Sequence, residues 1–360
     1  MPRPIQDQVI VITGASSGIG LATAIAAARR GAKVVLASRN QRDLDSAVET
    51  IRRDGGEATA LRTDVAVADD VEALARHAVQ SYGRIDTWVN NAGVSAYAPF
   101  REQSIEDVRR IMDVNFFGQV HGARAALPHL ERTEGALICV GSTLSDRGVP
   151  LQGIYCASKH AIKGWVDSLR VELQHDGVPV RVTLVKPSSI NTPLFNKAKT
   201  QLGVMPQPIP PVYDPALAAR AILRAAEGNE RDVFVGGAGK FLSVSERISP
   251  KLVDVQQRMQ GFDDQKTDWP VREGAPHNLY EPVEYDGGVR GDFLRDSHRE
   301  SPYQRMDANV VVSASAAAAA LALAAATSRR TSQGSGLTMA LGLGALAFVG
   351  KALLAAVYEG

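Results

Sequence analysis

A short apolar strand that runs directly into a glycine-rich turn and then into a helix limits the possible folds of this chain more than any other stretch. Residues 9–12 are Val-Ile-Val-Ile, the turn covers 13–20, and the helical stretch continues to Arg30. Glycine permits positive φ and removes the Cβ that would keep a phosphate away, while the first amides of the helix point their N–H groups at an anion. This order predicts a phosphate-binding loop, although a plain strand-to-helix turn is the alternative for a glycine pattern alone. The candidate ligands in the turn are Gly14, Ser16, Ser17, Gly18, Ile19 and Gly20.

Strand and helix patterns alternate along the first 240 residues. Parallel strands joined by right-handed helical crossovers are the economical packing for such a series. The sequence therefore predicts an α/β domain on a seven-stranded parallel sheet. The expected strands are 9–12, 33–37, 59–64, 85–89, 136–140, 180–185 and 232–236, and the helices after the first are 41–53, 69–82, 104–130, 154–175 and 215–227.

The end of the second strand carries the residues expected to select the cofactor. In a dinucleotide-binding sheet an acidic side chain here binds the ribose hydroxyls of NAD, whereas an arginine accommodates the 2′-phosphate of NADP. Ser38 stands where the carboxylate would be, and Arg39 offers a planar fork for a phosphate. Hydrogen bonds to charged groups are worth about 1.5–3 kcal/mol, enough for roughly a ten- to hundredfold preference. The pair predicts NADP(H) in preference to NAD(H).

Two further strand ends carry groups that could contact a nucleotide. Asp64 and Val65 end the third strand, where the carboxylate could accept from an adenine amine or could equally cap a turn. The fourth strand ends in Asn90-Asn91-Ala92-Gly93, whose amides could hold the loop together under the cofactor, although such clusters are usually turns. The candidate ligands are Asp64, Val65, Asn91, Ala92 and Gly93.

Tyr155 and Lys159 are four residues apart on an expected helix, so the ammonium can lie beside the phenol. Free tyrosine titrates near pH ~10, and a neighbouring cation lowers that pKa towards the range in which general acid–base catalysis works best. The pair predicts a catalytic tyrosine. The motif alone is a weak indication, because tyrosine and lysine at this interval are common on solvated helix faces.

Polar groups from three other segments are expected at the same edge. Asn115 lies among apolar residues in the helix 104–130, and a buried asparagine must bond to backbone or to water. Ser142 ends the fifth strand, thirteen residues before Tyr155, which is enough for a loop to leave the sheet and return. Residues 188–215, which follow the sixth strand, have no clear period and are typical of a lid over a substrate pocket. After the sixth strand the candidate cofactor ligands are Pro187, Ser188, Ile190 and Thr192.

Composition excludes several classes of protein. Lys and Arg number 40 and Asp and Glu 39, a balance that gives no general attraction to nucleic acid. The only cysteines, Cys139 and Cys156, have the spacing of neither a disulfide framework nor a metal site, so we expect two buried free thiols and no metal. The N-terminus lacks the regions of a signal peptide, and the catalytic part is expected in the cytoplasm.

Taken together, these residues resemble the short-chain dehydrogenase/reductase family in its single-domain form over residues 7–240. The resemblance implies a doubly wound Rossmann sheet with NADP(H) at its carboxyl edge and, commonly, a homodimer or homotetramer packed through helices such as 154–175. The motifs that match in type, order and spacing are Thr13-Gly14-x3-Gly18-x-Gly20, Asn90-Asn91-Ala92-Gly93, Asn115, Ser142 and Tyr155-x3-Lys159.

The resemblance also implies a role for each catalytic candidate. Tyr155 would donate or accept the proton, and Ser142 would polarise the substrate carbonyl. Lys159 would lower the pKa of Tyr155 and bind the nicotinamide ribose, together with Tyr155, and Asn115 would support a proton-relay water. Ser188 is a departure, because family members usually have glycine after this proline; its side chain could narrow the nicotinamide end of the site or donate to the carboxamide.

The family does not explain the last third of the chain. Residues 241–305 are polar and rich in Gly, Pro, Asp and Arg, which predicts an extension partly laid over the domain and partly disordered. Residues 306–360 form an apolar Ala/Leu-rich tail, expected to be helical, in which Arg329 and Arg330 separate the runs 310–328 and 337–357. Spanning a bilayer takes roughly 20 apolar residues, so a spanning segment, an interfacial membrane anchor and a partner-binding helical pair are the alternatives.

The predicted function is an NADP(H)-dependent oxidoreductase that transfers a hydride between nicotinamide and a carbonyl or secondary alcohol. Apolar residues in 143–153 and 188–215 favour a hydrophobic small-molecule substrate. The alternative is a catalytically silent nucleotide sensor or scaffold that works through its C-terminal tail. Because a binding protein has no chemical need for both Ser142 and Tyr155, the enzyme is favoured.

Overall fold

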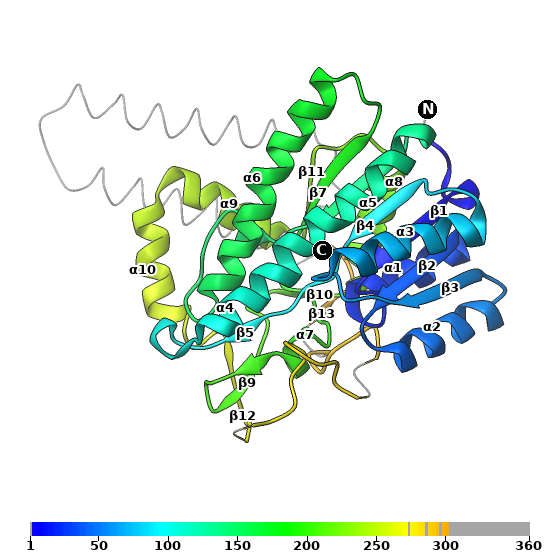
Figure 1. Ribbon diagram of the computed structural model, residues 1–360. Coiled ribbons are helices and arrows are strands. Elements are labelled where there is room, and N and C mark those ends of the chain that lie inside the picture. The colour runs from blue at the N-terminus through cyan, green and yellow to red at the C-terminus, as the bar shows by residue number, and fades with distance from the viewer. Residues whose placement is uncertain (1, 273, 285–286, 295–296, 302–360) are drawn as a thin grey trace, which may run out of the picture. The chain divides into compact units, whose positions relative to one another are not determined.

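The computed structural model describes residues 2–272, 274–284, 287–294 and 297–301 (Figure 1). The chain divides into two compact units, Met1–Arg299 and Glu300–Gly360. The description below concerns the first unit, because almost all of the second lies outside the described residues.

A seven-stranded parallel sheet forms the centre of this unit, as the sequence predicts. The strand order is β11-β7-β6-β4-β1-β2-β3, so the direction of winding reverses between β1 and β4. Ligands of doubly wound sheets bind at this switch point, beyond the carboxyl ends of the strands. The strands are β1 (Val9–Thr13), β2 (Lys33–Ser38), β3 (Glu57–Arg62), β4 (Thr87–Asn90), β6 (Ala136–Val140), β7 (Arg181–Pro187) and β11 (Asp232–Val235).

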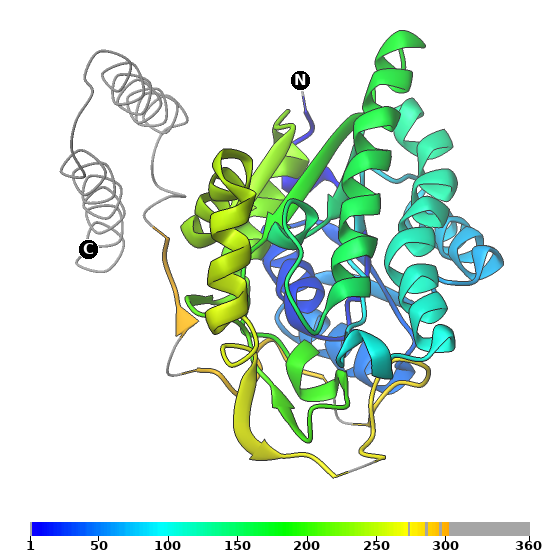
Figure 2. The same ribbon diagram turned by 90° about the vertical axis from the view of Figure 1, so that its left-hand side faces the viewer.

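Helices cover both faces of the sheet (Figures 1 and 2). A hydrophobic core lies on each face of the sheet, and successive residues of β1 belong alternately to the two cores. Ile10 and Ile12 pack with α1, α2 and α8, whereas Val9 and Val11 pack with α3, α5 and α6. Strands buried on both faces are continuously apolar, which is why β1 shows no polar alternation. The helices are α1 (Gly18–Arg29), α2 (Gln41–Arg53), α3 (Ala68–Tyr82), α4 (Ile105–Met112), α5 (Gly118–Thr133), α6 (Gly153–His175) and α8 (Pro215–Glu227).

The helix expected over 104–130 is interrupted. After α4 a π-helical turn covers Asp113–Phe117, and α5 begins at Gly118. The turn adds a residue to the helical repeat, which local apolar spacing does not reveal. Two strands are also displaced from their expected positions, since β3 runs from Glu57 to Arg62 and β4 from Thr87 to Asn90.

Short elements replace the structureless lid and much of the polar extension. Each small strand pairs with a strand that is distant in sequence, so no local periodicity predicts it. The pairs are β5 (Ala96–Tyr97) with β8 (Lys199–Thr200), β9 (Val204–Pro206) with β12 (Lys266–Pro270), and β10 (Val212–Tyr213) with β13 (Ser297–His298); the helices are α7 (Leu194–Lys197), α9 (Gly237–Ile248) and α10 (Pro250–Gln260).

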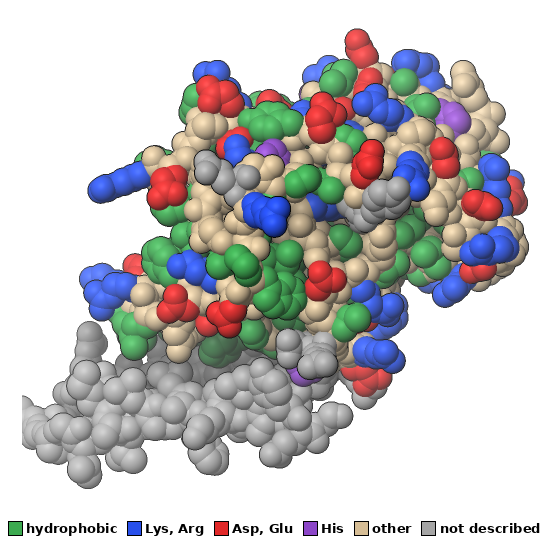
Figure 3. Space-filling view, turned by 90° about the horizontal axis from the view of Figure 1, so that it is seen from below, with side chains coloured by type: hydrophobic (Ala, Val, Ile, Leu, Met, Phe, Trp, Pro, Cys, Tyr) green, Lys and Arg blue, Asp and Glu red, His purple; other side chains and the backbone are tan. Residues whose placement is uncertain are grey.

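One face of the molecule carries side chains of both charge signs, and none of the described helices could span a membrane. Side chains of both signs are mixed with apolar ones on the face seen in Figure 3. Within the described ranges, no helix is both long enough and apolar enough to cross a membrane. The apolar runs 310–328 and 337–357 lie outside those ranges. Cys139 and Cys156 are buried free thiols, as predicted.

Candidate active site

The turn between β1 and α1 has a backbone that only glycine supports. Gly14 and Gly18 have φ of 65° and 57°, in the left-handed region. A Cβ at Gly14 would lie 2.8 Å from the Ala92 Cα, and one at Gly20 would lie 2.3 Å from the Gly14 carbonyl oxygen. The turn is therefore packed against the end of β4 and leaves its outer side free of side chains at these positions.

The loop after β4 is hydrogen bonded to this turn. Asn91 Nδ2 donates to the carbonyl oxygens of Thr13 at 2.9 Å and Gly14 at 3.2 Å. The backbone N–H groups of Asn91 and Ala92 both donate to Thr13 Oγ1, at 3.0 and 3.1 Å. The asparagine thus fastens two strand ends together at the switch point, and a Cβ on the nearby Gly93 would lie 3.4 Å from Asn115 Oδ1.

Asn115 lies in the π-helical turn and is completely buried. Its Oδ1 accepts from the Val94 N–H at 2.8 Å, and its Nδ2 donates to the Val94 carbonyl at 3.0 Å and to Ser158 Oγ at 3.1 Å. The Asn115 side chain therefore bonds both the N–H and the carbonyl of Val94, as a neighbouring strand would. Protein groups satisfy the amide, as a buried asparagine requires; the proton-relay water stays a prediction.

Ser142 lies at the carboxyl end of β6 and begins a short 3₁₀ turn, Thr143–Ser145. Its Oγ accepts from the Leu144 N–H at 3.0 Å, and its own N–H donates to Ser145 Oγ at 3.2 Å. Because a backbone donor holds the oxygen, the hydroxyl proton is available for donation. Burial raises the pKa of the Tyr155 phenol, and hydrogen bonding to Ser142 opposes that rise.

Tyr155 and Lys159 project from α6, with Lys159 Nζ 5.5 Å from the centre of the phenol ring. Nζ donates to the Val140 carbonyl at 3.1 Å. The expectation of a lowered Tyr155 pKa is wrong for this structure, because burial raises the pKa of the phenol more than the Ser142 bond lowers it. Burial also lowers the pKa of Lys159 to about 8. At neutral pH the phenol therefore keeps the proton that it would donate.

Arg39 has partners that the sequence does not indicate. Its guanidinium donates to the backbone carbonyls of Asn278, Leu279 and Tyr280, with Nη1 2.6 Å from the Tyr280 oxygen and 3.4 Å from the Leu279 oxygen. The neighbouring Ser38 Oγ accepts from the Asn40 N–H at 3.1 Å. Arg39 thus stands at the end of β2, where it was predicted, and binds the C-terminal extension.

Asp64 acts as a turn cap and as half of an ion pair. Oδ1 accepts from the Ala66 N–H at 3.0 Å, and Oδ2 lies 2.7 Å from Arg110 Nη2. Although burial opposes ionisation, these bonds hold the pKa of Asp64 below its ordinary value. Asp64 therefore caps the turn, and its contact with an adenine amine stays a prediction. Val65 is buried against Gly118, where a Cβ would lie 2.7 Å from Val65 Cγ2.

The segment after β7 folds back onto the glycine turn. A Cβ at Gly18 would lie 3.2 Å from the Thr192 side chain, and Lys197 Nζ donates to Ser17 Oγ at 2.9 Å. Ser188 N–H donates to the Val235 carbonyl at 2.9 Å.

Lys197 is a candidate missed by sequence reasoning, because it lies on a helix of four residues with no motif around it. The other predicted cofactor ligands lie in the same two segments. Ser16 and Ile19 belong to the glycine turn, Pro187 is the last residue of β7, and Ile190 forms a β-bridge with Tyr213.

An aromatic group beside Tyr155 was also missed. Tyr97 is 1% exposed and interacts electrostatically with Tyr155, while burial holds the pKa of Tyr97 well above its usual range. Its ring lies 6.4 Å from that of Phe195, and Phe195 lies 6.0 Å from Phe293. Three segments far apart in sequence supply these rings, so no local pattern could have predicted the group.

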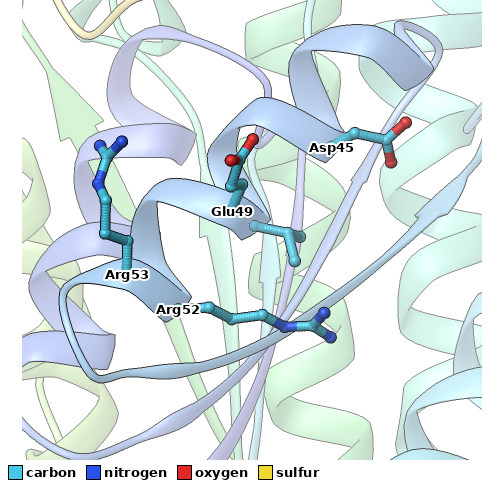
Figure 4. A pocket seen from close by; sticks show the side chains of 5 residues that line it. Asp45, Glu49, Arg52 and Arg53 are labelled. Carbon is cyan, nitrogen blue, oxygen red and sulfur yellow. The ribbon is translucent and has the colours of Figure 1, made fainter.

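A hollow elsewhere on the surface has no connection with this site. It lies along one face of α2, where acidic and basic side chains extend into solvent (Figure 4). Its lining residues are Asp45, Val48, Glu49, Arg52 and Arg53.

The comparisons with known proteins identify the family. A model described as short chain dehydrogenase matches residues 8–203, and the chain belongs to this family. It is 38% identical over 317 residues to the uncharacterized oxidoreductase YxnA of Bacillus subtilis (strain 168), a match that covers 87% of this chain and 88% of that protein. It is 35% identical over 240 residues to 11-beta-hydroxysteroid dehydrogenase A of Sesamum indicum, covering 64% of this chain and 68% of the relative.

Solved structures agree with this assignment. A short-chain dehydrogenase/reductase from Burkholderia phymatum in complex with NAD has a TM-score of 0.62 and 27% identity, covering 69% of this chain and 95% of that one. An alcohol dehydrogenase from Thermococcus sibiricus complexed with 5-hydroxy-NADP has a TM-score of 0.56 and 26% identity, covering 63% and 95%. The chain is therefore an oxidoreductase of the short-chain dehydrogenase type, a class that acts on alcohols or carbonyls with a nicotinamide cofactor.

The residues at the switch point fit such a cofactor. The glycine turn has the left-handed backbone and the missing side chains that let a pyrophosphate approach the first amides of α1. Ser142 follows β6, which lies beyond β4 in the same sheet, and Tyr155 and Lys159 lie on α6.

Proposed function

We propose that this chain is an NADP(H)-dependent oxidoreductase that interconverts a carbonyl and a secondary alcohol. The observation that carries the proposal is the convergence of Ser142, Tyr155 and Lys159 beside the glycine turn. Bound there, the nicotinamide would supply or accept the hydride. Gly14, Gly18 and the first amides of α1 would hold its phosphates.

The protein groups have separate tasks in carbonyl reduction. Ser142 donates its hydroxyl proton as a hydrogen bond to the carbonyl oxygen, since a backbone N–H already occupies its own oxygen. Tyr155, protonated at neutral pH, donates its proton to the same oxygen as negative charge develops there. Lys159, held by the Val140 carbonyl, then stabilises the phenolate that remains. Alcohol oxidation follows the same path in reverse.

Removal of the phenolic hydroxyl tests this assignment. Tyr155→Phe keeps the ring and removes the proton donor, so consumption of NADPH with a panel of ketones and aldehydes should fall by about a hundredfold or more. Tyr82→Phe, the same change on α3, is the matched control and should leave the rate unchanged. Equal rates for Tyr155→Phe and the parent protein would reject the mechanism.

Preference for NADP(H) rests on Arg39 and on Ser38, which replaces a carboxylate at the end of β2. The substrate that we propose is hydrophobic, because the ring of Tyr97, which interacts with Tyr155, packs in one apolar cluster with Phe195 and Phe293. An aromatic wall favours the body of an apolar carbonyl compound, whose polar oxygen is then positioned by the two hydroxyls.

We also propose that the protein acts as a homo-oligomer and that its C-terminal part contacts a membrane. The described chain contributes a row of exposed apolar side chains on α9 and α10, which suits an interface or a membrane surface. Fractionation of the full-length protein beside a version that ends at Pro302 tests the membrane proposal; if both stay in the soluble fraction, it is rejected. The row is Phe241, Val244, Ile248, Leu252, Val255 and Met259.

A further inference from the structure

Part of the C-terminal extension crosses the end of β2, where the adenosine of a dinucleotide would lie. This part, the strap, consists of the described residues 278–284 and 287–291, drawn in gold and orange in Figure 1. Three successive strap carbonyls, those of residues 278–280, accept from the guanidinium of Arg39. The Val283 carbonyl accepts from Asn40 Nδ2 at 3.3 Å. The strap therefore occupies the partners expected for the adenosine ribose and its phosphate.

The strap then reaches the phosphate-binding turn. Gly18 N–H, the first amide of α1, donates to the Gly288 carbonyl at 2.8 Å, and Ser17 and Gly288 form a parallel bridge. The first amides of a helix have no intrahelical acceptors and are the groups that bind anions. The Gly288 carbonyl therefore accepts from an N–H group that would otherwise be available to a phosphate.

Further along, the strap is bonded to the segment that carries Thr192. Gly291 N–H donates to the Asn191 carbonyl at 3.3 Å. A Cβ at Gly291 would lie 2.5 Å from the Thr192 carbonyl oxygen, so the two backbones touch. In chain order the strap thus passes the expected adenosine, pyrophosphate and nicotinamide ends of the site.

The strap is anchored at its start and leaves the floor of the site accessible. The Leu279 side chain is completely buried in the core, and Tyr280 donates its hydroxyl proton to Asp107 Oδ1 at 2.8 Å. Solvent still reaches Gly14 and Ile19, which are only half-buried. The strap therefore crosses the site without filling it.

We propose that the strap is a gate over the dinucleotide site, which stays anchored at Leu279 and Tyr280, lifts from Asn40 and Gly18 to admit a nicotinamide cofactor and closes again over its adenosine and pyrophosphate. The inference rests on the proposed function, since it concerns the same site. It adds a conformational step that the shared fold does not supply. The family model ends at residue 203, before the strap, and the solved structures above match at most 69% of this chain. The match to YxnA, which covers 87% of this chain, necessarily includes it.

A reversible cross-link between the strap and α2 tests the gate. A Cβ at Gly287 would lie 2.9 Å from Asp43 Cγ, close enough for cysteines at both positions to form a disulfide. The test protein is full-length and carries Asp43→Cys and Gly287→Cys; the control carries Asp43→Cys alone. Burial raises the pKa of Cys139 to about 12 and of Cys156 to about 11, so the native thiols do not compete.

The gate predicts opposite effects of the cross-link on empty and loaded protein. Oxidised before addition of NADPH, the double variant should take up the cofactor at least about tenfold more slowly than its reduced form. Oxidised after addition, it should retain NADPH through desalting, and dithiothreitol should reverse both effects. Equal uptake and release in both forms, with the disulfide verified by mass, would overturn the gate. Failure to cross-link when NADPH is bound would overturn it too, because the strap would then compete with the cofactor.

A second variant covers the case in which the double variant does not fold. Tyr280→Phe removes the bond to Asp107, and loss of one hydrogen bond changes an equilibrium by about two- to tenfold. Stopped-flow fluorescence should show NADPH association and dissociation both accelerated by about that factor, with Tyr82→Phe unchanged. Unaltered rates would overturn the gate alone. Absence of NADPH and NADH binding in the parent protein would instead overturn the proposed function, and the gate with it.

Discussion

At the scale of single residues, Lys159 shows how a functional group can reduce stability. The ammonium is 3% exposed, and burial lowers its pKa from 10.5 to about 8. Below pH 8 both the folded and the unfolded chain carry the charge, and the folded chain bears the full cost of burying it, up to about 3 kcal/mol. Between pH 8 and 10.5 only the unfolded chain keeps the proton, so the stability of the parent protein rises with pH.

Lys159→Met should therefore stabilise the cofactor-free protein at pH 7 by about 1–2 kcal/mol, once the lost bond to the Val140 carbonyl is deducted. The difference should shrink as pH rises from 8 to 10.5, and reductase activity should fall. Urea unfolding at pH 7 and pH 9.5 measures both free energies. A difference that grows with pH would contradict the buried-charge account.

Arg39 is expected both to select the cofactor and to hold the strap. The ratio of the affinities for NADPH and NADH separates these two roles. Arg39→Ala should weaken NADPH binding more than NADH binding by about tenfold or more, because hydrogen bonds to a phosphate are lost only with NADPH. Loosening of the strap affects both cofactors equally. Tyr280→Phe, which loosens the strap and keeps the guanidinium, should leave the ratio of the two Kd values unchanged. An unchanged ratio in Arg39→Ala would remove the support for NADP(H) preference.

At the scale of elements, the same substitution should have opposite effects in two helices. Gly20, in α1, has no room for a Cβ, which would lie 2.3 Å from the Gly14 carbonyl oxygen. Gly164, inside α6, has nothing within 4 Å of that position. Gly20→Ala should distort the turn and abolish cofactor binding, whereas Gly164→Ala should stabilise the protein by about 0.5–1 kcal/mol. Thermal unfolding and NADPH titration of both variants test this, and a stabilising Gly20→Ala would contradict the packing described for the turn.

The elements that could be predicted from sequence are those with local causes. Buried strands are apolar runs, helices have periodic faces, and Asn40 and Ser104 cap α2 and α4 through their own side chains. The π-helical turn could not be predicted, because it depends on the bonds of Asn115 to Val94 on another segment. The small strands need distant partners for the same reason.

The residues of the candidate site also divide into those that sequence can predict and those that it cannot. Residues belonging to motifs could be named in advance, since chemistry restricts their type and spacing. Lys197, Tyr97 and the strap could not, because their importance comes from contacts across more than fifty residues, such as that of Lys197 with Ser17. The raised pKa of Tyr155 was also beyond prediction, since sequence gives the neighbouring lysine but not the depth of burial that outweighs it.

At the scale of the whole molecule, the question is where the catalytic unit ends. The sequence predicts a boundary near residue 240, and this boundary stays a prediction. The compact unit in the structure runs to Arg299 and includes the strap. Leu279 is 0% exposed and Phe293 is 8% exposed, so side chains of the extension belong to the cores of the domain.

Two truncations should therefore behave differently. A chain that ends at Pro302 retains Leu279 and Phe293 and should unfold in urea at nearly the same concentration as the full-length protein. A chain that ends at Gly274 loses both, and since burial of each side chain is worth about 1.5–3 kcal/mol, its free energy of unfolding should fall by roughly 3–6 kcal/mol, enough to unfold a marginal domain. If the shorter chain were as stable as the longer one, residues 275–302 would not belong to the catalytic unit, and the boundary near 240 would stand.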